Sequence, residues 1–261
     1  MKKILSKMLG GALLFGLTMS LTSCEDILGH WEKPTPNPIT PGGGSEGGGG
    51  SSTATYTMAA DAAVGDLGKL ICTDGHIHAD GADAECTKDR VALICYVGND
   101  AETSTTYNHG LALALSDASG YQIWCTQNTA ICLGTGHQFS TVDAAKTDMA
   151  GIANTDALVG TTPHNHGDNA AKAAREYNGG THPSGTSAWF LPSAGQWDKM
   201  ITTAGDYATL KTNANLQNSK YYSSSTEKDA NGAWDFYSND CNWYGGGKES
   251  SSYTVRACLA F

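Results

Sequence analysis

A segment rich in proline and glycine divides the chain and confines any compact fold to the residues that follow it. Four prolines lie between positions 34 and 41, and positions 42–50 are mostly glycine. A segment of this composition cannot bury enough apolar surface to order itself. We interpret residues 24–55 as a disordered linker that is stiff near its prolines and flexible beyond them. Residues 56–261 remain, and that length suffices for one sizeable domain.

The start of the chain has the pattern of a secretory signal peptide. Lys2, Lys3 and Lys7 form a short basic start, and the stretch from Met8 to Leu21 is nearly all apolar. A permanent transmembrane helix needs about 20 apolar residues, so this run is too short to span a bilayer comfortably. Its length is that of the apolar core of a signal peptide. We therefore expect residues 1–23 to be removed on export.

The apolar run ends at a cysteine in a context that resembles a lipobox. Leu21-Thr22-Ser23-Cys24 places two small residues between an apolar residue and the cysteine, which in lipoproteins receives diacylglycerol and becomes the new N-terminus. An ordinary signal peptide followed by a chance cysteine is the alternative. Glu25 and Asp26 resemble the surface-export signal of some Gram-negative lipoproteins. We expect a lipid anchor on Cys24 in the cell outer membrane, with the domain facing outward.

The charge of the mature chain argues against nucleic acid as a partner. The whole chain carries 16 basic and 26 acidic residues, and the signal peptide removes three lysines, which leaves a formal charge of −13. An acidic chain repels phosphate backbones and anionic lipids. Apart from the signal peptide, the sequence contains no long apolar run, so lipid on Cys24 is the expected membrane contact.

Seven cysteines remain beside Cys24, and an exported chain can form disulfides between them. An odd number leaves at least one thiol unpaired. The preferred pairs are Cys72 with Cys86, which flank a turn-rich stretch, and Cys125 with Cys132. The spacing does not fix the connectivity.

The pattern of residues 56–261 predicts an α+β domain. Asp-Gly turns flank an alternating segment at residues 73–81, and Val91–Val97 and Gly110–Leu115 are apolar runs of strand length. Alanine-rich stretches at 144–153 and 169–177 favour helices. The strongest helix signal begins at Ser193, with Gln196 placed to complete a capping box and an apolar face at Trp197, Met200, Ile201 and Ala204. Short strands return between Tyr221 and Phe261, and strands on both sides of helices suit this fold class.

Four segments of the last third resemble C-type-lectin-like domains of the formylglycine-generating-enzyme type. The sequence WFLPSAGQW at residues 189–197 resembles the "LP[ST]xxEW" helix start of those proteins. The sequence YYSSSTE at residues 221–227 resembles their "YWSSTE" strand, and Ala233-Trp234 stands where they have "AW". The ending VRACLAF at residues 255–261 resembles their "VRPVLAF" terminus. The resemblance implies a C-type-lectin-like fold for residues 56–261.

Within that group, the sequence is similar to the lipoprotein targets of diversity-generating retroelements, the variable proteins of those systems. Their C-terminal lectin-like module carries a hypervariable ligand-binding face, which here corresponds to about residues 221–261. Tyr222 stands where the family has Trp, and Ala257-Cys258 stands where it has Pro-Val. The resemblance implies a surface receptor or adhesin that binds an extracellular protein or glycan.

The C-terminal segment has the composition of a binding surface. Tyrosine and tryptophan alternate with Ser, Asn, Gly and Asp, as in antibody paratopes, where aromatic rings supply contact area at low entropic cost. Alternate residues of a strand point to opposite faces. We therefore expect Trp234, Phe236 and Trp243 to pack inside the domain. The expected ligand-binding residues are Asp235, Tyr237, Asn239, Asp240, Asn242 and Tyr244.

Two His-x-His pairs raise the question of a metal. His76 and His78 lie between two aspartates, and His164 and His166 precede Asp168. Residues i and i+2 of a strand share a face, so each pair offers two ligands. The spacing fixes no third or fourth ligand, and such pairs also occur on solvated hairpins. We therefore predict no metal site and no cofactor from the sequence.

Two other functional classes remain as alternatives. A copper-dependent oxidase of the formylglycine-generating type needs a close cysteine pair near the C-terminus, whereas Cys241 and Cys258 are widely separated. The sequence also has no Gly-x-Ser-x-Gly elbow and no phosphate-binding glycine loop, so we expect a non-enzymatic protein with no catalytic residues. A fimbrial or other structural surface subunit is the second alternative, for which the sequence marks no assembly strand.

Lipidation of Cys24 is directly testable. Cells fed a labelled fatty acid should incorporate the label into this protein, and Cys24→Ala should abolish the incorporation because the acceptor thiol is gone. A Cys95→Ala variant is the matched control and should label normally. Label retained by Cys24→Ala would place the anchor elsewhere.

Overall fold

The computed structural model describes residues 56–78, 88–118, 122–125, 132–134, 136–160, 169–250 and 252–261. The expected signal peptide, the linker and Cys24 lie outside the described residues, as do Cys86 and the His164–His166 pair. Helices and two sheets make up the described part, so the predicted α+β class is confirmed. None of its helices is long and apolar enough to cross a bilayer.

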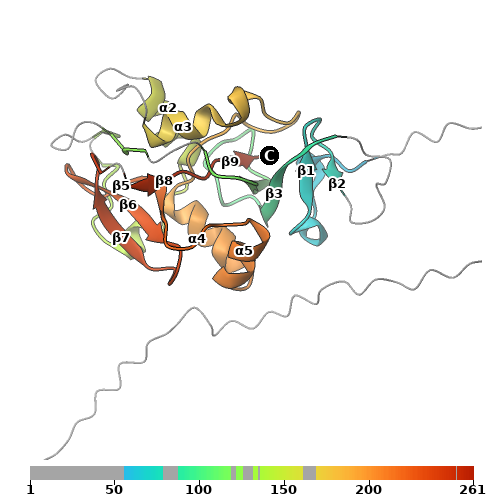
Figure 1. Ribbon diagram of the computed structural model, residues 1–261. Coiled ribbons are helices and arrows are strands. Elements are labelled where there is room, and N and C mark those ends of the chain that lie inside the picture. The colour runs from blue at the N-terminus through green and yellow to red at the C-terminus, as the bar shows by residue number, and fades with distance from the viewer. Residues whose placement is uncertain are drawn as a thin grey trace, which may run out of the picture.

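The first sheet contains five strands in the order β2-β1-β3-β4-β9. All pairings in this sheet are antiparallel. The chain's last strand therefore pairs with a strand from the first half of the domain, and Figure 1 shows β9 beside the C-terminus in the middle of the fold. Its strands are β1 (Leu70–Cys72), β2 (Ile77–His78), β3 (Arg90–Val97), β4 (Gly110–Ala114) and β9 (Cys258–Ala260).

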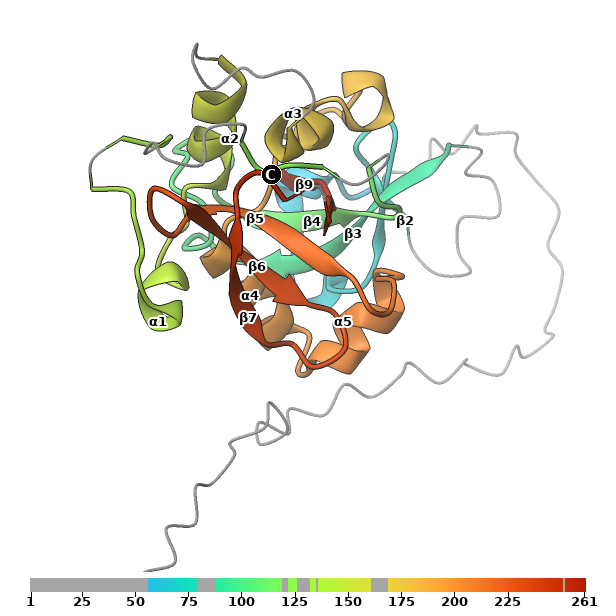
Figure 2. The same cartoon turned by 60° about the vertical axis from the view of Figure 1, so that its left-hand side comes forward.

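The second sheet contains four strands in the order β7-β6-β5-β8. Strands β5, β6 and β7 form an antiparallel meander, and β8 pairs with β5 in parallel. Figure 2 shows this sheet in front of the strands β3 and β4. Its strands are β5 (Tyr221–Glu227), β6 (Gly232–Tyr237), β7 (Trp243–Gly247) and β8 (Tyr253–Thr254).

Helices and short 3₁₀ turns complete the domain. The 3₁₀ turns are η1 (Ala59–Asp61), η2 (Val64–Asp66) and η3 (Tyr177–Gly180). The α-helices are α1 (Val142–Ala145), α2 (Gly151–Gly160), α3 (Ala170–Arg175), α4 (Ala194–Thr203) and α5 (Tyr207–Asn213).

Helix α4 packs against both sheets. Ser193 caps it as predicted: its side chain accepts a hydrogen bond from the Gln196 backbone, and the Gln196 side chain accepts one from the Ser193 backbone at 2.9 Å. Trp197 and Met200 are buried in one apolar cluster with β4 residues of the first sheet and with Tyr222 and Phe236 of the second. The predicted apolar face of this helix is confirmed, and it joins the two sheets into one core.

The alanine-rich stretch at 144–153, predicted as one helix, is divided between α1 and α2. Asp148 is buried at the break. One oxygen of its carboxylate accepts a hydrogen bond from the Ala150 backbone, and the other accepts bonds from the side chains of Asn154 and Thr226. A continuous helix would draw the Asp148 carboxylate away from these partners. Tertiary hydrogen bonds thus override the local preference of the alanines.

Arg256 fixes the C-terminal strand in place. Its side chain is buried and donates to Asp117 at 2.7 Å and to the backbone oxygens of Ala114, Ala214 and Asn215 at 2.8–3.1 Å. Those oxygens belong to β4 and to the end of α5, so one guanidinium ties β9 to both. A fully buried cation is tolerated here because one carboxylate and three backbone oxygens accept its hydrogen bonds.

We expect Arg256→Met to lower the free energy of unfolding by about 3–5 kcal/mol, because it leaves Asp117 and three carbonyls without their donor. Urea denaturation measures the loss. Arg175→Met is the matched control: Arg175 forms a surface ion pair with the exposed Asp156, so its loss should cost less than about 1 kcal/mol. Equal losses for the two variants would contradict the anchoring role of Arg256.

Candidate functional site

Three tyrosine side chains meet on the solvent face of the second sheet. Tyr221 of β5 lies opposite Tyr237 of β6, and their ring centroids are 4.7 Å apart. Tyr244 of β7 completes the group, with its ring 5.8 Å from that of Tyr221 and 6.5 Å from that of Tyr237. We name these three residues the tyrosine face. Both distances to Tyr244 belong to edge-to-face contacts, which aromatic rings favour.

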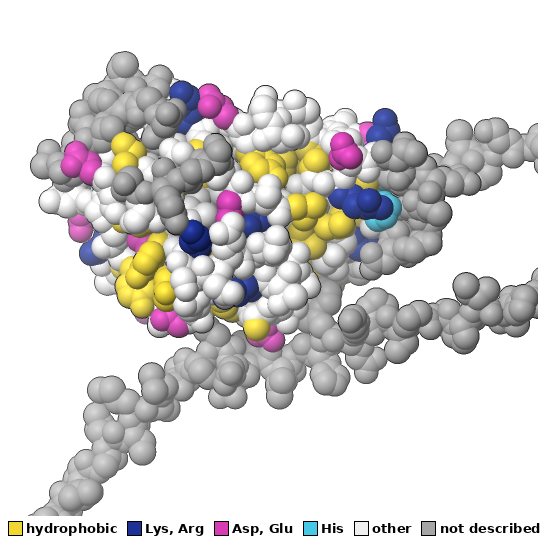
Figure 3. Space-filling view, in the orientation of Figure 1, with side chains coloured by type: hydrophobic (Ala, Val, Ile, Leu, Met, Phe, Trp, Pro, Cys, Tyr) yellow, Lys and Arg dark blue, Asp and Glu magenta, His cyan; other side chains and the backbone are white. Residues whose placement is uncertain are grey.

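The tyrosine face is accessible to a ligand. Tyr221 and Tyr244 are 37% and 41% exposed, and among the described residues Val64 is the other large apolar side chain with such exposure. Figure 3 shows one of several patches of hydrophobic side chains, a class that includes tyrosine there, on the side of the molecule where Figure 1 draws β7. Exposed clustered aromatics are uncommon on a soluble domain and mark interaction sites.

The opposite face of the same strands is buried. Phe236 is fully buried between Tyr222 and Trp197, with ring centroids 5.7 and 4.9 Å away, and Trp243 is half-buried against it. Trp234 is buried and donates its indole N–H to the Phe139 oxygen at 2.6 Å. The predicted packing role of Trp234, Phe236 and Trp243 is therefore confirmed. Because side chains alternate along a strand, these buried rings and the three tyrosines lie on opposite faces of the sheet.

The turn between β6 and β7 carries three of the predicted ligand-binding residues. Asn239, Asp240 and Asn242 are all exposed there. Asn239 donates to the Tyr237 hydroxyl at 3.1 Å, and the Tyr244 hydroxyl donates to Asp240 at 3.4 Å. The turn therefore orients two rings of the tyrosine face while leaving its own polar groups open to solvent.

Asp235 does not lie on the surface, contrary to the sequence prediction that placed it among exposed ligand-binding residues. It is only 3% exposed, under the Gly246 backbone, which donates to its carboxylate at 3.0 Å. Its other oxygen is buried with no hydrogen-bond partner in the described part of the chain. Burial raises the pKa of this carboxyl to about 7, although the hydrogen bond from Gly246 opposes the shift.

The glycine run of β7 makes room for this arrangement. A Cβ atom on Gly246 would lie 1.8 Å from the Tyr253 hydroxyl and 2.6 Å from the Asp235 carboxylate. Both contacts are closer than real Cβ atoms allow, so only glycine lets these side chains lie over β7. Tyr253 in turn donates to the Gly247 oxygen at 3.1 Å.

Sequence reasoning missed Tyr221 as a member of the face and Tyr253 as its neighbour. Tyr221 pairs with Tyr237 on one side and with Tyr253 on the other. The alternation of β5 already places Tyr221 opposite in direction to Tyr222, but its neighbours depend on the strand register. The register is a tertiary property that the spacing of the sequence does not contain.

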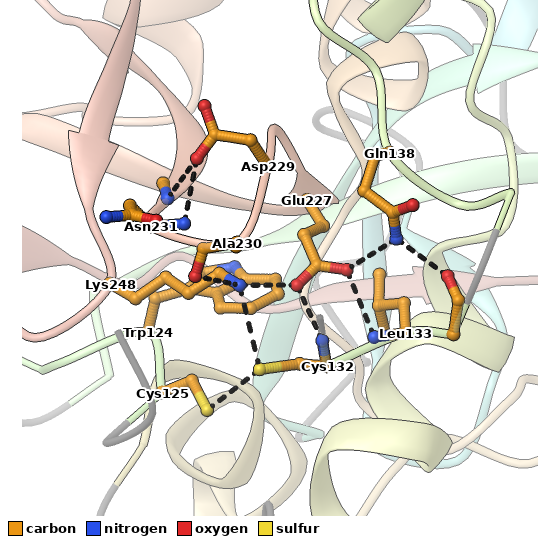
Figure 4. A network of polar contacts seen from close by, with 12 residues as sticks. Trp124, Cys125, Cys132, Leu133, Gln138, Glu227, Asp229, Ala230, Asn231 and Lys248 are labelled. Carbon is orange, nitrogen blue, oxygen red and sulfur yellow. Dashed lines mark hydrogen bonds and ion pairs between the residues drawn. The ribbon is translucent and has the colours of Figure 1, made fainter. Parts of the chain in front are cut away.

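A buried ion pair supports the sheet at its other end. Lys248 donates to Glu227 at 2.5 Å, and both side chains are 0% exposed. Figure 4 shows the Glu227 carboxylate at the centre of a network. It also accepts from the backbones of Cys132 and Leu133 at 2.6 and 3.1 Å and from Gln138 at 3.1 Å. The ion pair at its centre is fully buried, and we interpret the network as holding the surrounding loops to β5.

Cys125 and Cys132 lie within this network. Their Sγ atoms are 3.0 Å apart, and the Cys132 sulfur is 3.8 Å from the Lys248 ammonium. Contact with Cys125, together with burial, raises the pKa of the Cys132 thiol. The structure thus brings together one of the two cysteine pairs that the sequence favoured.

The two cysteines considered for oxidase chemistry lie on different elements. Cys258 is fully buried in β9, where burial and the neighbouring Cys95 raise the pKa of its thiol. Cys241 lies half-buried in the turn after β6, in the left-handed backbone region with φ 61°.

No protein-family model and no curated protein matches the sequence. One solved structure resembles the fold, a fimbrial protein from Bacteroides ovatus, with a TM-score of 0.55 and 19% sequence identity. The similarity covers 75% of this chain and 48% of that protein, so the chain matches about half of that protein's length. Similarity at this identity concerns the fold alone.

Asp235 should make the stability of the domain depend on pH. Between about pH 4 and pH 7 the folded state keeps the Asp235 proton whereas the unfolded state loses it, so stability falls as the pH rises through this range. Asp235→Asn removes this contribution. Relative to the wild type, the variant should gain about 3 kcal/mol between pH 4.5 and pH 8 in urea denaturation. Asp143→Asn, at an exposed helix position, is the control, and an equal gain there would contradict the assignment.

Proposed function

We propose that this protein is a surface-displayed receptor or adhesin that binds an extracellular protein or glycan through its tyrosine face. The observation that carries the proposal is the cluster of Tyr221, Tyr237 and Tyr244, whose rings are in mutual contact, with Tyr221 and Tyr244 exposed and Tyr237 half-buried. Tyrosine combines a large rigid ring with a hydroxyl, so it contributes contact area and hydrogen bonding at a small entropic cost.

The surroundings of the face suit binding. Phe236 and Trp197 support the sheet from behind, which keeps the strands rigid when a ligand docks. Asn239, Asp240 and Asn242 supply adaptable polar groups beside the rings. In such interfaces a few aromatic anchors carry most of the binding energy and polar neighbours adjust specificity. We assign the anchor role to Tyr237 and Tyr244, with Tyr221 as a third anchor.

We further propose a C-type-lectin-like fold and membership of the variable lipoproteins of diversity-generating retroelements, with residues 221–261 as the variable region. The sequence motifs support this, and so does the pairing of β9 with β4, which places the last strand in the sheet formed by the first half of the domain. In this proposal lipid on Cys24 anchors the chain in the outer membrane, and the Pro/Gly-rich linker holds the domain outward.

A fimbrial subunit is the second candidate, favoured by two observations. The fold resembles that of a fimbrial protein. Strand β7 is an outer strand of its sheet, and three of its five residues are exposed. An open edge can accept a strand from another subunit. The two candidates differ in assembly: filaments sheared from cells should contain the chain if it is a structural subunit, whereas a receptor should remain with the membrane.

Binding is tested with glycan and extracellular-protein arrays probed with the purified chain. Tyr237→Ala combined with Tyr244→Ala should weaken binding of any identified partner by at least about 30-fold, since the loss of even one anchor of about 2 kcal/mol has that effect. Tyr237→Phe combined with Tyr244→Phe is the matched control, because it retains the rings and should retain most of the affinity.

An unchanged melting temperature for the alanine pair is needed to exclude unfolding. Binding that survives the alanine pair unchanged would place the ligand site elsewhere.

A further inference from the structure

We propose that Cys72, His76 and His78 form a binding site for Zn²⁺ at the start of the domain. Each residue offers one ligand atom, and the three atoms lie within 4.8 Å of one another. All three side chains are buried, with exposures of 0%, 2% and 8%. The histidine pair alone was too weak a signal in the sequence, and the fold supplies the missing third ligand.

The β1–β2 hairpin explains how these residues meet. Leu70 pairs with His78 and Ile71 with Ile77, and the Cys72 backbone donates to the His76 oxygen at 2.9 Å. Cys72 therefore lies opposite His76, and this pair is the next one toward the turn after Ile71 and Ile77. Side chains alternate along strands, so Cys72, His76 and His78 share one face of the hairpin. Ile71 and Ile77 occupy the other face and are buried in the core.

The turn that sets this spacing requires glycine at position 75. Gly75 has φ +93°, and a Cβ atom there would lie 2.2 Å from the Ser184 oxygen. Its backbone donates to the Cys72 oxygen at 2.9 Å, which closes the turn. The hairpin also receives the first described residues of the chain, because the Ile77 backbone donates to the Thr57 oxygen at 2.7 Å. A metal here would fasten the hairpin where the linker enters the domain.

His76 already has the surroundings of a metal ligand. Its Nδ1 atom lies 2.5 Å from the Asp74 carboxylate, and its ring stacks on Tyr56 with centroids 4.4 Å apart. A carboxylate that accepts a hydrogen bond from Nδ1 fixes the ring and makes Nε2 a better ligand. Asp74 is thus the outer partner that histidine ligands characteristically have.

His78 contacts Arg90, and this contact competes with metal binding. The Arg90 guanidinium lies 2.8 Å from the Nε2 atom of His78. Coordination through Nε2 would displace the guanidinium, and coordination through Nδ1 would put a proton on Nε2, facing another donor. Arg90 is exposed and can turn into solvent. Removing Arg90 should therefore tighten metal binding.

The donor set selects the ion. One thiolate and two imidazoles suit Zn²⁺, which accepts sulfur and nitrogen in tetrahedral sites, whereas Ca²⁺ and Mg²⁺ require oxygen ligands. Three protein ligands leave the fourth tetrahedral position for water or another donor. The Cys72–Cys86 disulfide suggested by the sequence is the competing state, because a disulfide sulfur cannot supply the thiolate.

The test uses the full-length chain, purified under reducing conditions and titrated with Co²⁺ as a spectroscopic substitute for Zn²⁺. We expect one equivalent of Co²⁺ to bind and to produce a thiolate-to-cobalt charge-transfer band. Added Zn²⁺ should then displace the Co²⁺ and remove the band. Cys72→Ser should abolish the band, and His76→Gln and His78→Gln should each weaken binding at least tenfold. His137→Gln, at an exposed histidine, is the matched control and should bind normally.

Two peripheral variants keep the test decisive if the ligand variants fail to fold. Asp74→Asn should weaken binding about 10-fold to 100-fold, as losses of outer partners do. Arg90→Gln should strengthen it. The proposal is overturned if the reduced chain binds no Co²⁺, if the bound ion shows no thiolate band, or if Asp74→Asn and Arg90→Gln leave the affinity unchanged. It is also overturned if Cys72 proves to be in a disulfide in protein isolated from cells.

Discussion

The pairing of β9 with β4, locked by Arg256, is the constraint on which the rest of the structure depends. Three β9 residues lie beside Leu111, Ala112 and Leu113 of β4, a strand in which every residue is buried. The preceding Arg256 donates hydrogen bonds to Asp117 and to three backbone oxygens of β4 and of the end of α5. The segment that carries the second sheet must therefore return to the edge of the first sheet, beside β4.

That return places α4 between the two sheets and gives the domain a shared core. Trp197 contacts Tyr222 and Phe236 of the second sheet, and Met200 lies in the same cluster as Leu111 and Leu113. Because one face of β5–β7 packs against this helix, the other face is left to face outward. The position of the core thus determines where the tyrosine face lies. The three tyrosine rings need not contribute to the stability of the domain.

Two buried polar sites in the second sheet differ in how completely their hydrogen bonds are satisfied. The Glu227–Lys248 pair is fully desolvated, and such a pair is tolerated only when its remaining hydrogen-bonding capacity is satisfied. Backbone donors from Cys132 and Leu133 and the Gln138 amide meet this requirement. Asp235 is the contrasting case: one carboxylate oxygen accepts a hydrogen bond from Gly246, and the other has no partner among the described residues. Burial with only this one hydrogen bond raises the pKa of the carboxyl.

Local chemistry in the sequence was sufficient to determine the fold class, the α4 cap and the inward direction of Phe236, because each depends on neighbours a few residues apart. It was also sufficient to separate Tyr237 and Tyr244 from the core, since alternation along a strand is a local rule. It did not reveal α5, the break between α1 and α2, or the burial of Asp235. Those features depend on partners distant in the chain, such as Thr226 for Asp148 and Gly246 for Asp235. The addition of Tyr221 to the face was decided by strand register, and the juxtaposition of Cys72 with two histidines by the hairpin, because only folding brings separated residues within contact distance.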